Sequence, residues 1–455
     1  MLRPVTASAL AVAAVLALGA AGAAAQQTAP DPTPTAPTTP TAPEGPPVLD
    51  SLRLPRVISA QQGHARFLVG VRLSVQSKLT VQIIQGDSRR VVQTVTEDAA
   101  RPAGRAYVRV EAVDSRGFQL LQGSYRLRLQ ATDDAGRVSE RVERAFRLRL
   151  TAPRGQLDAY TVPLWRAFQR QAGTSADGQL VAVVGPRGAA ATAGIRRGDV
   201  ITAIDGRSVA TAGAMAAALR ALPADKAVTV ELVRDGRQIS ASLTPKPDWE
   251  EAPDYEASLA VAVRREPRTL AYSYAQARQL VESSKLAEAR ELIADWPRSW
   301  RRSAPGQLVQ ADLFAARRRW KQALGAYSRA RARDRANSAA ELGRGIALSE
   351  RDKTRPSITA FAAASRLDPG DPAAAGFRAY ALLRADRVAE AVAAAQTAVG
   401  LDPRYADAFL PLGIGLLAQG DKPNGVKALR RGLVLLEDAE RADRMIRAHL
   451  VRADP

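Results

Sequence analysis

The chain contains no cysteine and only two histidines, His64 and His449, in 455 residues. The lack of cysteine excludes disulfides, thiolate nucleophiles, Cys-based metal sites and the acylated cysteine of a lipoprotein anchor. A Ser-His-Asp triad needs a histidine base, and no Gly-x-Ser-x-Gly motif lies near either histidine. We therefore predict a protein that is not an enzyme and that uses no metal and no cofactor.

Other catalytic motifs are missing as well. The sequence has no His-Glu-x-x-His metal motif, no Gly-x-x-x-x-Gly-Lys phosphate loop and no dinucleotide-binding fingerprint. Ser240-Ala241-Ser242 superficially looks like the nucleophile region of a Ser-Lys peptidase. It falls in a predicted strand, however, and no catalytic α/β domain follows it.

Acidic residues are the minority charge. The chain has 46 Asp and Glu against 65 Lys and Arg, which gives a formal net charge of +19. Such a balance favours anionic partners, for example acidic proteins or an anionic cell-wall polymer. The excess is spread along the chain, so we expect no nucleic-acid site. The alternative is a solvated, arginine-rich surface with no dedicated anion site.

Long apolar runs are confined to the beginning of the chain. Arg3 precedes a mostly apolar stretch, and Ala23-Ala24-Ala25 offers a small-residue cleavage site. This pattern predicts a signal peptide over residues 1–25 and an exported protein that is secreted, periplasmic or associated with the cell envelope. An uncleaved membrane anchor is the alternative. Residues 26–47 are rich in Pro and Thr, which predicts a disordered linker.

Residues 48–150 alternate between apolar and polar side chains, as half-buried strands do. The clearest series are Phe67, Val69, Val71 and Leu73, then Leu127 and Leu129, then Phe146, Leu148 and Leu150. Gly123-Ser124-Tyr125 begins one run and Asp133-Asp134-Ala135-Gly136 ends it. These signals resemble the last strands of bacterial immunoglobulin-like modules, which implies a β-sandwich acting as a spacer or adhesion module. The alternating arginines Arg126, Arg128, Arg147 and Arg149 should line one solvated face.

Residues 154–246 contain a turn, strand and hairpin pattern from Gly194 to Val209. Its core is Gly194-Ile195-Arg196-Arg197-Gly198-Asp199-Val200-Ile201, and Asp205-Gly206 then supplies a turn with positive φ angles. The stretch resembles a bacterial PDZ domain of the type found in high-temperature-requirement serine proteases, here without the protease. We expect an α+β domain with a helix capped by Thr211 and a closing hairpin around Asp235-Gly236.

PDZ domains bind an extended C-terminal peptide as an added strand. The resemblance aligns residues 154–159 with the family's Arg-Gly-x-Φ-Gly-Φ loop, whose amides would hold the terminal carboxylate. Asp158 stands where the family has glycine, and its charge would repel a carboxylate. Binding of free C-termini, binding of internal segments and a role in docking only therefore all stay open. The implied peptide-binding residues are Gly155, Leu157, Asp158, Ala159, Tyr160, Met215, Ala216 and Leu219.

The tripeptide Leu-Asp-Pro occurs twice, at Leu367–Pro369 and Leu401–Pro403, 34 residues apart. Small residues recur with the same step, for example at Ser357 and Ala391. This period resembles that of tetratricopeptide repeats, stacked helical hairpins that bind other polypeptides. We predict a linker over 247–269 and an all-α solenoid over 270–452, with five repeats and a capping helix.

In these repeats the first helix of each pair lines the concave surface, where ligands bind. The residues at the corresponding positions are Tyr274, Leu308, Leu342, Ile346, Tyr380, Leu410 and Ile414, with the polar Arg278 and Asp312 at the N-terminal end. Packing between helices is the alternative role for these side chains.

Together these patterns predict a multidomain chain: an immunoglobulin-like β-sandwich, a PDZ domain and a helical-repeat solenoid. The expected function is a non-catalytic exported scaffold that binds peptide segments or C-termini of other proteins. Two alternatives remain. One is a structural wall protein that binds anionic polymers, and the other is an accessory subunit of a separate envelope protease.

Overall fold

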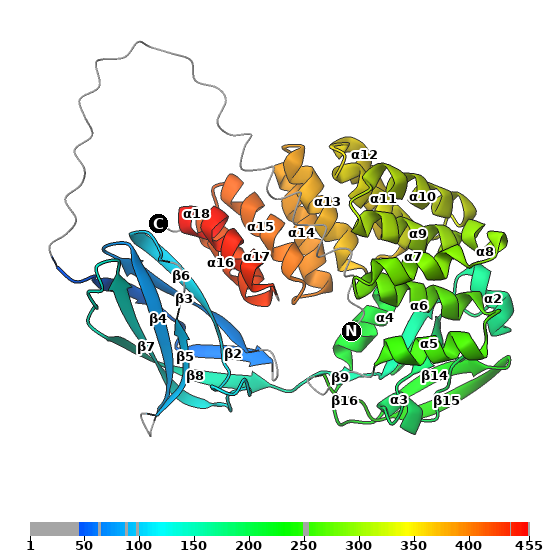
Figure 1. Cartoon of the computed structure of the whole chain (residues 1–455), viewed down its shortest axis with the longest axis horizontal. Coiled ribbons are helices and arrows are strands. Elements are labelled where there is room, and N and C mark those ends of the chain that lie inside the picture. The colour runs from blue at the N-terminus through cyan, green and yellow to red at the C-terminus, as the bar shows by residue number, and fades with distance from the viewer. Residues whose placement is uncertain are drawn as a thin grey trace, which may run out of the picture. The chain divides into compact units, whose positions relative to one another are not determined.

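The computed structural model describes residues 45–61, 65–86, 90–96, 100–248, 254–436 and 438–453. The predicted signal peptide and most of the predicted linker after it lie outside these residues, as does His64. The described chain forms two compact units. One comprises residues 153–421, and the other comprises the residues up to 152 together with those from 422 onward. Figure 1 labels the elements of both.

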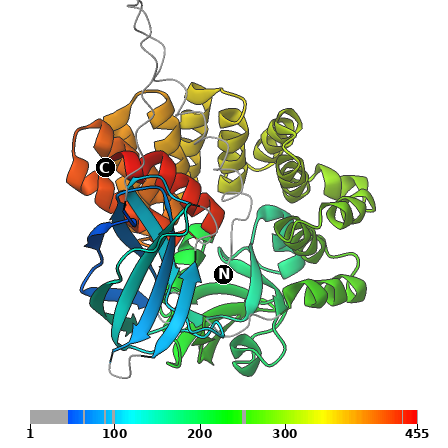
Figure 2. The same cartoon turned by 60° about the vertical axis from the view of Figure 1, so that its left-hand side comes forward.

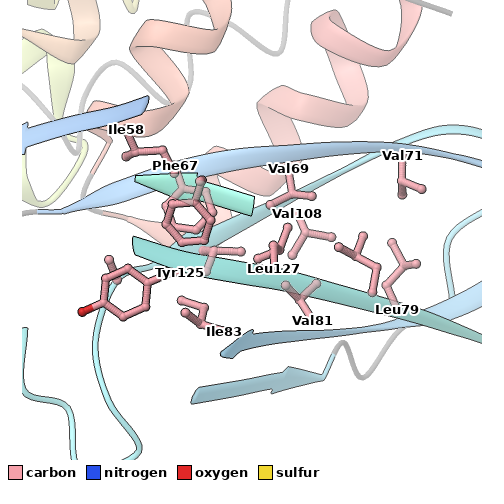
Figure 3. Packing of buried hydrophobic residues seen from close by; sticks show 14 of the residues in the cluster. Ile58, Phe67, Val69, Val71, Leu79, Val81, Ile83, Val108, Tyr125 and Leu127 are labelled. Atoms are coloured by element: carbon pink, nitrogen blue, oxygen red, sulfur yellow. The ribbon is translucent and has the colours of Figure 1, made fainter. Parts of the chain in front are cut away.

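The first strands form a two-sheet sandwich. They are β1 (Leu49–Arg53), β2 (Val57–Gln61), β3 (Arg66–Leu73), β4 (Ser77–Gln85), β5 (Val91–Thr96), β6 (Gly104–Glu111), β7 (Gly123–Asp133) and β8 (Val142–Thr151). One sheet has the order β1-β3-β6 and the other β2-β8-β7-β4-β5. Figure 3 shows how Val69, Val81, Val108 and Leu127 from facing strands meet in the core. The alternation of apolar residues predicted these inward faces, because successive side chains of a strand point to opposite sides.

Side-chain hydrogen bonds fix the two ends of β7, where the sequence predicted turns. β7 begins at Gly123, and the hydroxyl of Tyr125 donates a hydrogen bond to the carbonyl oxygen of Leu121 at 2.7 Å. Such a tyrosine corner is typical of immunoglobulin-like sandwiches. β7 ends at Asp133, whose carboxylate accepts from the backbone N–H of Arg137 at 2.8 Å, and Gly136 has a φ of 78°. The predicted sandwich is therefore confirmed.

The C-terminal helices belong to the same compact unit as the sandwich. They are α16 (Lys422–Leu435), α17 (Ala439–Met445), the π-turn η2 (Ile446–Leu450) and α18 (Val451–Ala453). Arg430 of α16 donates to the hydroxyl of Tyr107 in β6 at 2.8 Å, and its guanidinium lies 5.4 Å from the ring centroid. The sequence placed these helices in the solenoid. The difference arises because helical periodicity shows which face of a helix is apolar, not which surface covers it.

Residues 155–247 form a further domain with a six-stranded sheet, a separate two-stranded sheet of β9 and β16, and three helices. Its strands are β9 (Gly155–Gln156), β10 (Ala159–Pro163), β11 (Gln179–Val184), β12 (Val200–Ile204), β13 (Arg207–Ser208), β14 (Val228–Arg234), β15 (Arg237–Leu243) and β16 (Lys246–Pro247). Its helices are α2 (Arg166–Ala172), α3 (Ala189–Thr192) and α4 (Ala212–Ala221). The main sheet has the order β10-β11-β12-β14-β15, which places β10 at its edge.

Local signals in this domain act as the sequence predicts. The hydroxyl of Thr211 accepts from the N–H of Ala214 at 3.1 Å and so caps α4. Asp235 and Gly236 adopt φ angles of 50° and 74° in the turn between β14 and β15. Both residue types tolerate this left-handed region at low cost, so the hairpin closes tightly.

The rest of the larger unit is helical. Its helices are α5 (Tyr255–Arg265), α6 (Leu270–Glu282), α7 (Leu286–Ala294), α8 (Arg298–Arg302), α9 (Ala304–Ala316), α10 (Trp320–Arg333), α11 (Ser338–Ser349), α12 (Thr354–Leu367), α13 (Pro372–Arg384), α14 (Val388–Leu401) and α15 (Ala406–Ala418). Figures 1 and 2 show α6 to α15 following one another as a stack of helical hairpins, which we call the repeat array. α5 lies in the segment that the sequence assigned to a linker, and it packs against β11.

The small residues of the 34-residue period lie where the helices approach one another. Ala289, Ala323, Ser357 and Ala391 are all fully buried. Proline begins α13 at Pro372, because its missing N–H is not needed in a first helical turn. Within the described part of the chain, no helix is long and apolar enough to span a membrane.

Candidate peptide-binding site

The edge strand β10 has one side of its backbone paired with β11. The carbonyl of Asp158 accepts from the N–H of Gly185 at 2.8 Å, and the N–H of Leu164 donates to Gly178 at 3.0 Å. Backbone groups of an antiparallel strand alternate in direction, so those of Ala159 and Thr161 point to the other side. Among the described strands, none pairs with β10 on that side. This edge is therefore unpaired among the described strands, and Thr161 on it is only 3% exposed.

Apolar residues near β10 and on α4 belong to one hydrophobic core. Leu157 and Met215 are buried in the same hydrophobic core, and Ala159 and Leu219 are partly buried against it. Ala216 is also half-buried. Both elements therefore contribute apolar positions that are only partly buried, and an added strand needs such positions for its side chains.

The loop before β10 is held in place by its neighbours. The N–H of Gly155 donates to the carbonyl of Leu222 at 2.8 Å, just past the end of α4. A Cβ atom at this glycine would lie 2.6 Å from the carbonyl oxygen of Pro223. Only glycine therefore allows this close approach of the loop to α4.

Asp158 takes the left-handed conformation that the family's glycine would occupy, with a φ of 55°. Its carboxylate is buried and accepts from the N–H of Ala189, in the first turn of α3, at 2.8 Å. Gly188 makes room for it, since a Cβ there would lie 2.5 Å from the Cβ of Asp158. The charge that the sequence placed beside a bound carboxylate is thus hydrogen-bonded to α3.

Tyr160 directs its side chain toward the repeat array. Its hydroxyl donates to Glu282 of α6 at 3.4 Å, and its ring lies 5.9 Å from that of Tyr255 in α5. Burial, together with the Glu282 carboxylate, holds the pKa of Tyr160 well above its usual value. The side chain of Tyr160 therefore lies away from the unpaired edge, and its backbone groups face β11.

The helix α4 is fixed by the array at its N-terminal end. The Asp368 carboxylate accepts from the hydroxyl of Thr211 at 2.7 Å and from the N–H of Gly213 at 2.8 Å. A Cβ at Gly213 would lie 2.5 Å from the backbone nitrogen of Asp371. The Leu-Asp-Pro turn after α12 thus caps a helix of the neighbouring domain.

Most of the predicted ligand contacts of the array are buried. Tyr274 packs against Trp165 and Phe168, with ring centroids 5.4 and 5.7 Å away, so it contacts the domain that precedes the array. The other buried members of the set are Leu308, Ile346, Tyr380 and Leu410, whereas Leu342 and Ile414 are half-buried. Most of these side chains are therefore buried between helices or against the preceding domain, where they contribute to packing.

The polar residues at the N-terminal end of the array form two pairs. Arg278 donates to Glu282 at 2.8 Å, and Tyr327 donates to Asp312 at 2.7 Å. Burial raises the pKa of Asp312 to about 6, although the hydrogen bond from Tyr327 and the charge of Arg278 oppose the shift. The raised pKa therefore places the ionisation of Asp312 near pH 6.

This shift predicts a pH effect on stability. The pKa of Asp312 rises from 3.8 to about 6 on folding, so its ionisation weakens the fold as pH rises through this window. The contribution is about 3 kcal/mol. We expect Asp312→Asn to remove it, so that the variant loses less free energy of unfolding than the wild type between pH 4 and pH 7. Urea titrations across this range measure the difference, and parallel pH profiles would contradict the assignment.

Sequence reasoning missed the residues that join the two domains. Asp368 and Arg220 are the main examples, since Arg220 donates to the carbonyl of Leu401 at 3.3 Å. The repeated Leu-Asp-Pro tripeptide marked Asp368 as a repeat residue only. Gly213, placed in the first turn of a predicted helix, was the one available hint of a close approach.

Comparison with known proteins identifies the PDZ domain. The family model of the PDZ domain matches residues 180–234. A segment of 66 residues is 38% identical to the periplasmic serine endoprotease DegP of Escherichia coli K12. This segment is 14% of this chain and 14% of that protein, so the chain spans about one seventh of its relative.

Similar solved structures include the following two. YrrB, described as a TPR protein with an unusual peptide-binding site, is 15% identical with a TM-score of 0.32, covering 42% of this chain and 98% of its own. Pseudomonas aeruginosa pilF is 15% identical with a TM-score of 0.35, covering 41% of this chain and 86% of its own. From its sequence motifs, its fold and the PDZ match, the chain carries a PDZ domain followed by a tetratricopeptide repeat array, preceded by an immunoglobulin-like sandwich.

Proposed function

We propose that this chain is an exported, non-catalytic scaffold whose PDZ domain binds an extended segment of another polypeptide as an added strand on β10. The observation that supports this proposal is the second edge of β10, where the backbone groups of Ala159 and Thr161 pair with no described strand, although Thr161 is only 3% exposed. PDZ domains and tetratricopeptide repeats are interaction modules. The N-terminal sequence pattern and the similarity to a periplasmic protein support export.

Two further features support the same reading. Asp158 is hydrogen-bonded to α3, which lowers the repulsion that its charge would exert on a ligand carboxylate. The array holds α4, one wall of the groove, through Asp368. A wall that is already fixed loses little conformational freedom when a ligand binds. In the array itself we propose ligand contacts only at the half-buried Leu342 and Ile414.

An array of immobilised ten-residue peptides, probed with the full chain, tests strand addition. We expect binding peptides to lose at least tenfold in affinity when alternate backbone amides near the bound end are N-methylated, because methylation removes the donors that pair with β10. N-methylation at the remaining amides serves as the matched control. Equal affinity for both methylated forms would exclude strand addition.

The arginine face of the sandwich supports a second candidate function, binding of an anionic wall polymer. Arg147 and Arg149 are exposed on β8, and Glu143 lies 2.8 Å from Arg128 and 3.7 Å from Arg126. The single carboxylate of Glu143 thus forms ion pairs with two of these arginines. Polymer binding through such a face should collapse as ionic strength rises, whereas strand addition should be less sensitive.

The similarity to DegP supports a third possibility, in which the scaffold presents substrates to a separate envelope protease. We expect the rate of such a protease on an unfolded substrate to change when this chain is added. A variant with lowered affinity for the selected peptides serves as the control. An unchanged rate would exclude the accessory role and leave the scaffold function intact.

A further inference from the structure

The positive charge of the repeat array is concentrated in one segment, although the excess of the whole chain is spread over all three domains. Residues 298–335, which span α8 to α10, contain eleven Lys and Arg against two Asp. The rest of the array, residues 270–297 and 336–418, contains 12 Lys and Arg against 13 Asp and Glu. The whole positive excess of the array therefore lies in this segment.

Most cations of this segment are exposed and have no carboxylate partner. Ten of the eleven are exposed, and Arg317 is half-buried. Among the residues that the structure describes, only Arg331 of this segment forms an ion pair, with Glu341. Arg333 donates instead to the carbonyl oxygen of Arg302 at 2.6 Å, which orients its guanidinium without neutralising it. The segment thus presents uncompensated positive charge on folded helices.

Three of these cations follow one another along α10, the second helix of its pair, and we call Lys321, Arg329 and Arg333 the basic row. With Gly325 between the first two, they are spaced by four residues and wind slowly around the helix. A terminal nitrogen of Arg329 lies 3.4 Å from the position that a Cβ atom at Gly325 would take, and its Nε donates to the side-chain oxygen of Gln307 at 2.5 Å. These contacts place the guanidinium in the middle of the row.

An open hollow lies at the beginning of the basic row. Its volume is about 790 Å³, and Gly325, which has no side chain, borders it. Two half-buried aromatic residues and three cations also line it: Phe314, Trp320, Arg319, Lys321 and Arg329. An apolar ligand group in the hollow can therefore contact aromatic rings while its charged neighbours reach the row.

We propose that the basic row binds an extended acidic segment of a partner polypeptide, with one apolar side chain of that segment in the hollow beside Trp320. Charge-assisted hydrogen bonds between guanidinium groups and carboxylates supply the attraction. Alternate side chains of an extended chain are about 7 Å apart, close to the step of about 6 Å between residues four apart on a helix. The aromatic rings of the hollow favour a polypeptide over a polymer of purely polar units.

This site is independent of strand addition on β10. The basic row belongs to the second helix of a pair, whereas Leu342 and Ile414, the array contacts proposed above, lie on the first helices α11 and α15. The acidic segment is therefore a second ligand, and a chain occupied at both places would hold two polypeptides.

Fluorescence anisotropy with the full chain tests the site, using a labelled peptide with Glu at alternate positions and one Phe near its end. Its C-terminus is amidated, so that it offers the PDZ domain no terminal carboxylate. We expect the double variant Arg329→Gln, Arg333→Gln to weaken binding by about tenfold. The same substitutions at Arg264 and Arg265, both exposed on α5, remove equal charge and serve as the matched control.

A change in the peptide and a further substitution in the protein test the hollow. Serine in place of the peptide's Phe should weaken binding to the wild type by about fivefold, because the apolar contact is lost. Gly325→Leu fills the hollow and favours α10, so it should remove the difference between the two peptides.

The outcomes separate the possible ligands. Weaker binding in the row variant but not in the control variant, together with a preference for the Phe peptide, supports the site. Equal binding of the Phe peptide to wild type and row variant, with α10 still folded by circular dichroism, would overturn it. Inorganic polyphosphate that binds as tightly at matched charge, with no difference between the Phe and Ser peptides, would overturn the polypeptide ligand in favour of an anionic polymer.

Discussion

Aspartate in place of Ala391 is expected to lower the free energy of unfolding of the repeat array by about 4 kcal/mol. Ala391 lies on α14, is fully buried and belongs to the small-residue series of the 34-residue period. A carboxylate at this position would be buried among apolar side chains without a partner, which costs far more than the loss of packing alone. Chemical denaturation followed by circular dichroism measures the effect.

Ala393 provides the control, because it is exposed on the same helix. Ala393→Asp introduces the same charge and the same change in helix propensity, and should shift the free energy of unfolding by less than about 0.5 kcal/mol. If Ala391→Asp melted at the temperature of the wild type, α14 would not present this face to its neighbours and the repeat phasing would be wrong.

The second large effect is expected at Gly213. A Cβ atom there would lie 2.5 Å from both the backbone nitrogen of Asp371 and the carbonyl carbon of Gly370. Alanine favours α4 itself by about 1 kcal/mol relative to glycine, yet it cannot fit against the array. We therefore expect Gly213→Ala to separate the PDZ domain from the array while both stay folded. Unfolding should change from one transition to two, and the radius of gyration should increase.

Two further variants make this test specific. Asp368→Ala leaves the N–H of Gly213 without its acceptor and should weaken the same contact by about 1–3 kcal/mol. Ala217→Leu changes an exposed position of α4 and should leave the single transition intact. A single transition in Gly213→Ala would show that the domains do not depend on this contact.

Local sequence signals predicted the parts of this structure that are built from local contacts. The Asp-Gly pairs predicted hairpins because their conformational preference acts within four residues. The small-residue series predicted where helices meet, because Ala323 and Ala391 occupy the same position two repeats apart. Asp133 and Gly136 predicted a turn for the same reason. Each of these predictions depends only on residues within one helix, strand or turn, or within one repeat.

Contacts between domains had no comparable signal. Asp368 and Asp402 occupy the same position of the repeat, yet the first caps α4 and the second lies beside Arg220. Tyr274 has the position of a ligand contact, but it packs against Trp165. Periodicity cannot distinguish these cases, because the partner is set by a surface far away in the sequence and not by the spacing of the repeat.

The binding groove illustrates the same limit. The resemblance to PDZ domains indicated the loop at residues 154–159, whereas the direction of the Asp158 carboxylate depends on α3 and on the space above Gly188. The cap on α4 depends on Asp368, which the repeat array supplies. Both features require three-dimensional contacts that no short motif encodes.

Hydrogen–deuterium exchange on the full chain, with and without a peptide selected from the array, tests strand addition most directly. We predict slower exchange at the amides of Ala159 and Thr161, which point away from β11, when the peptide is present. Amide exchange in the second helix of each pair of the repeat array should stay the same. Unchanged exchange throughout β10, with the peptide demonstrably bound, would show that the chain holds its ligand at another surface.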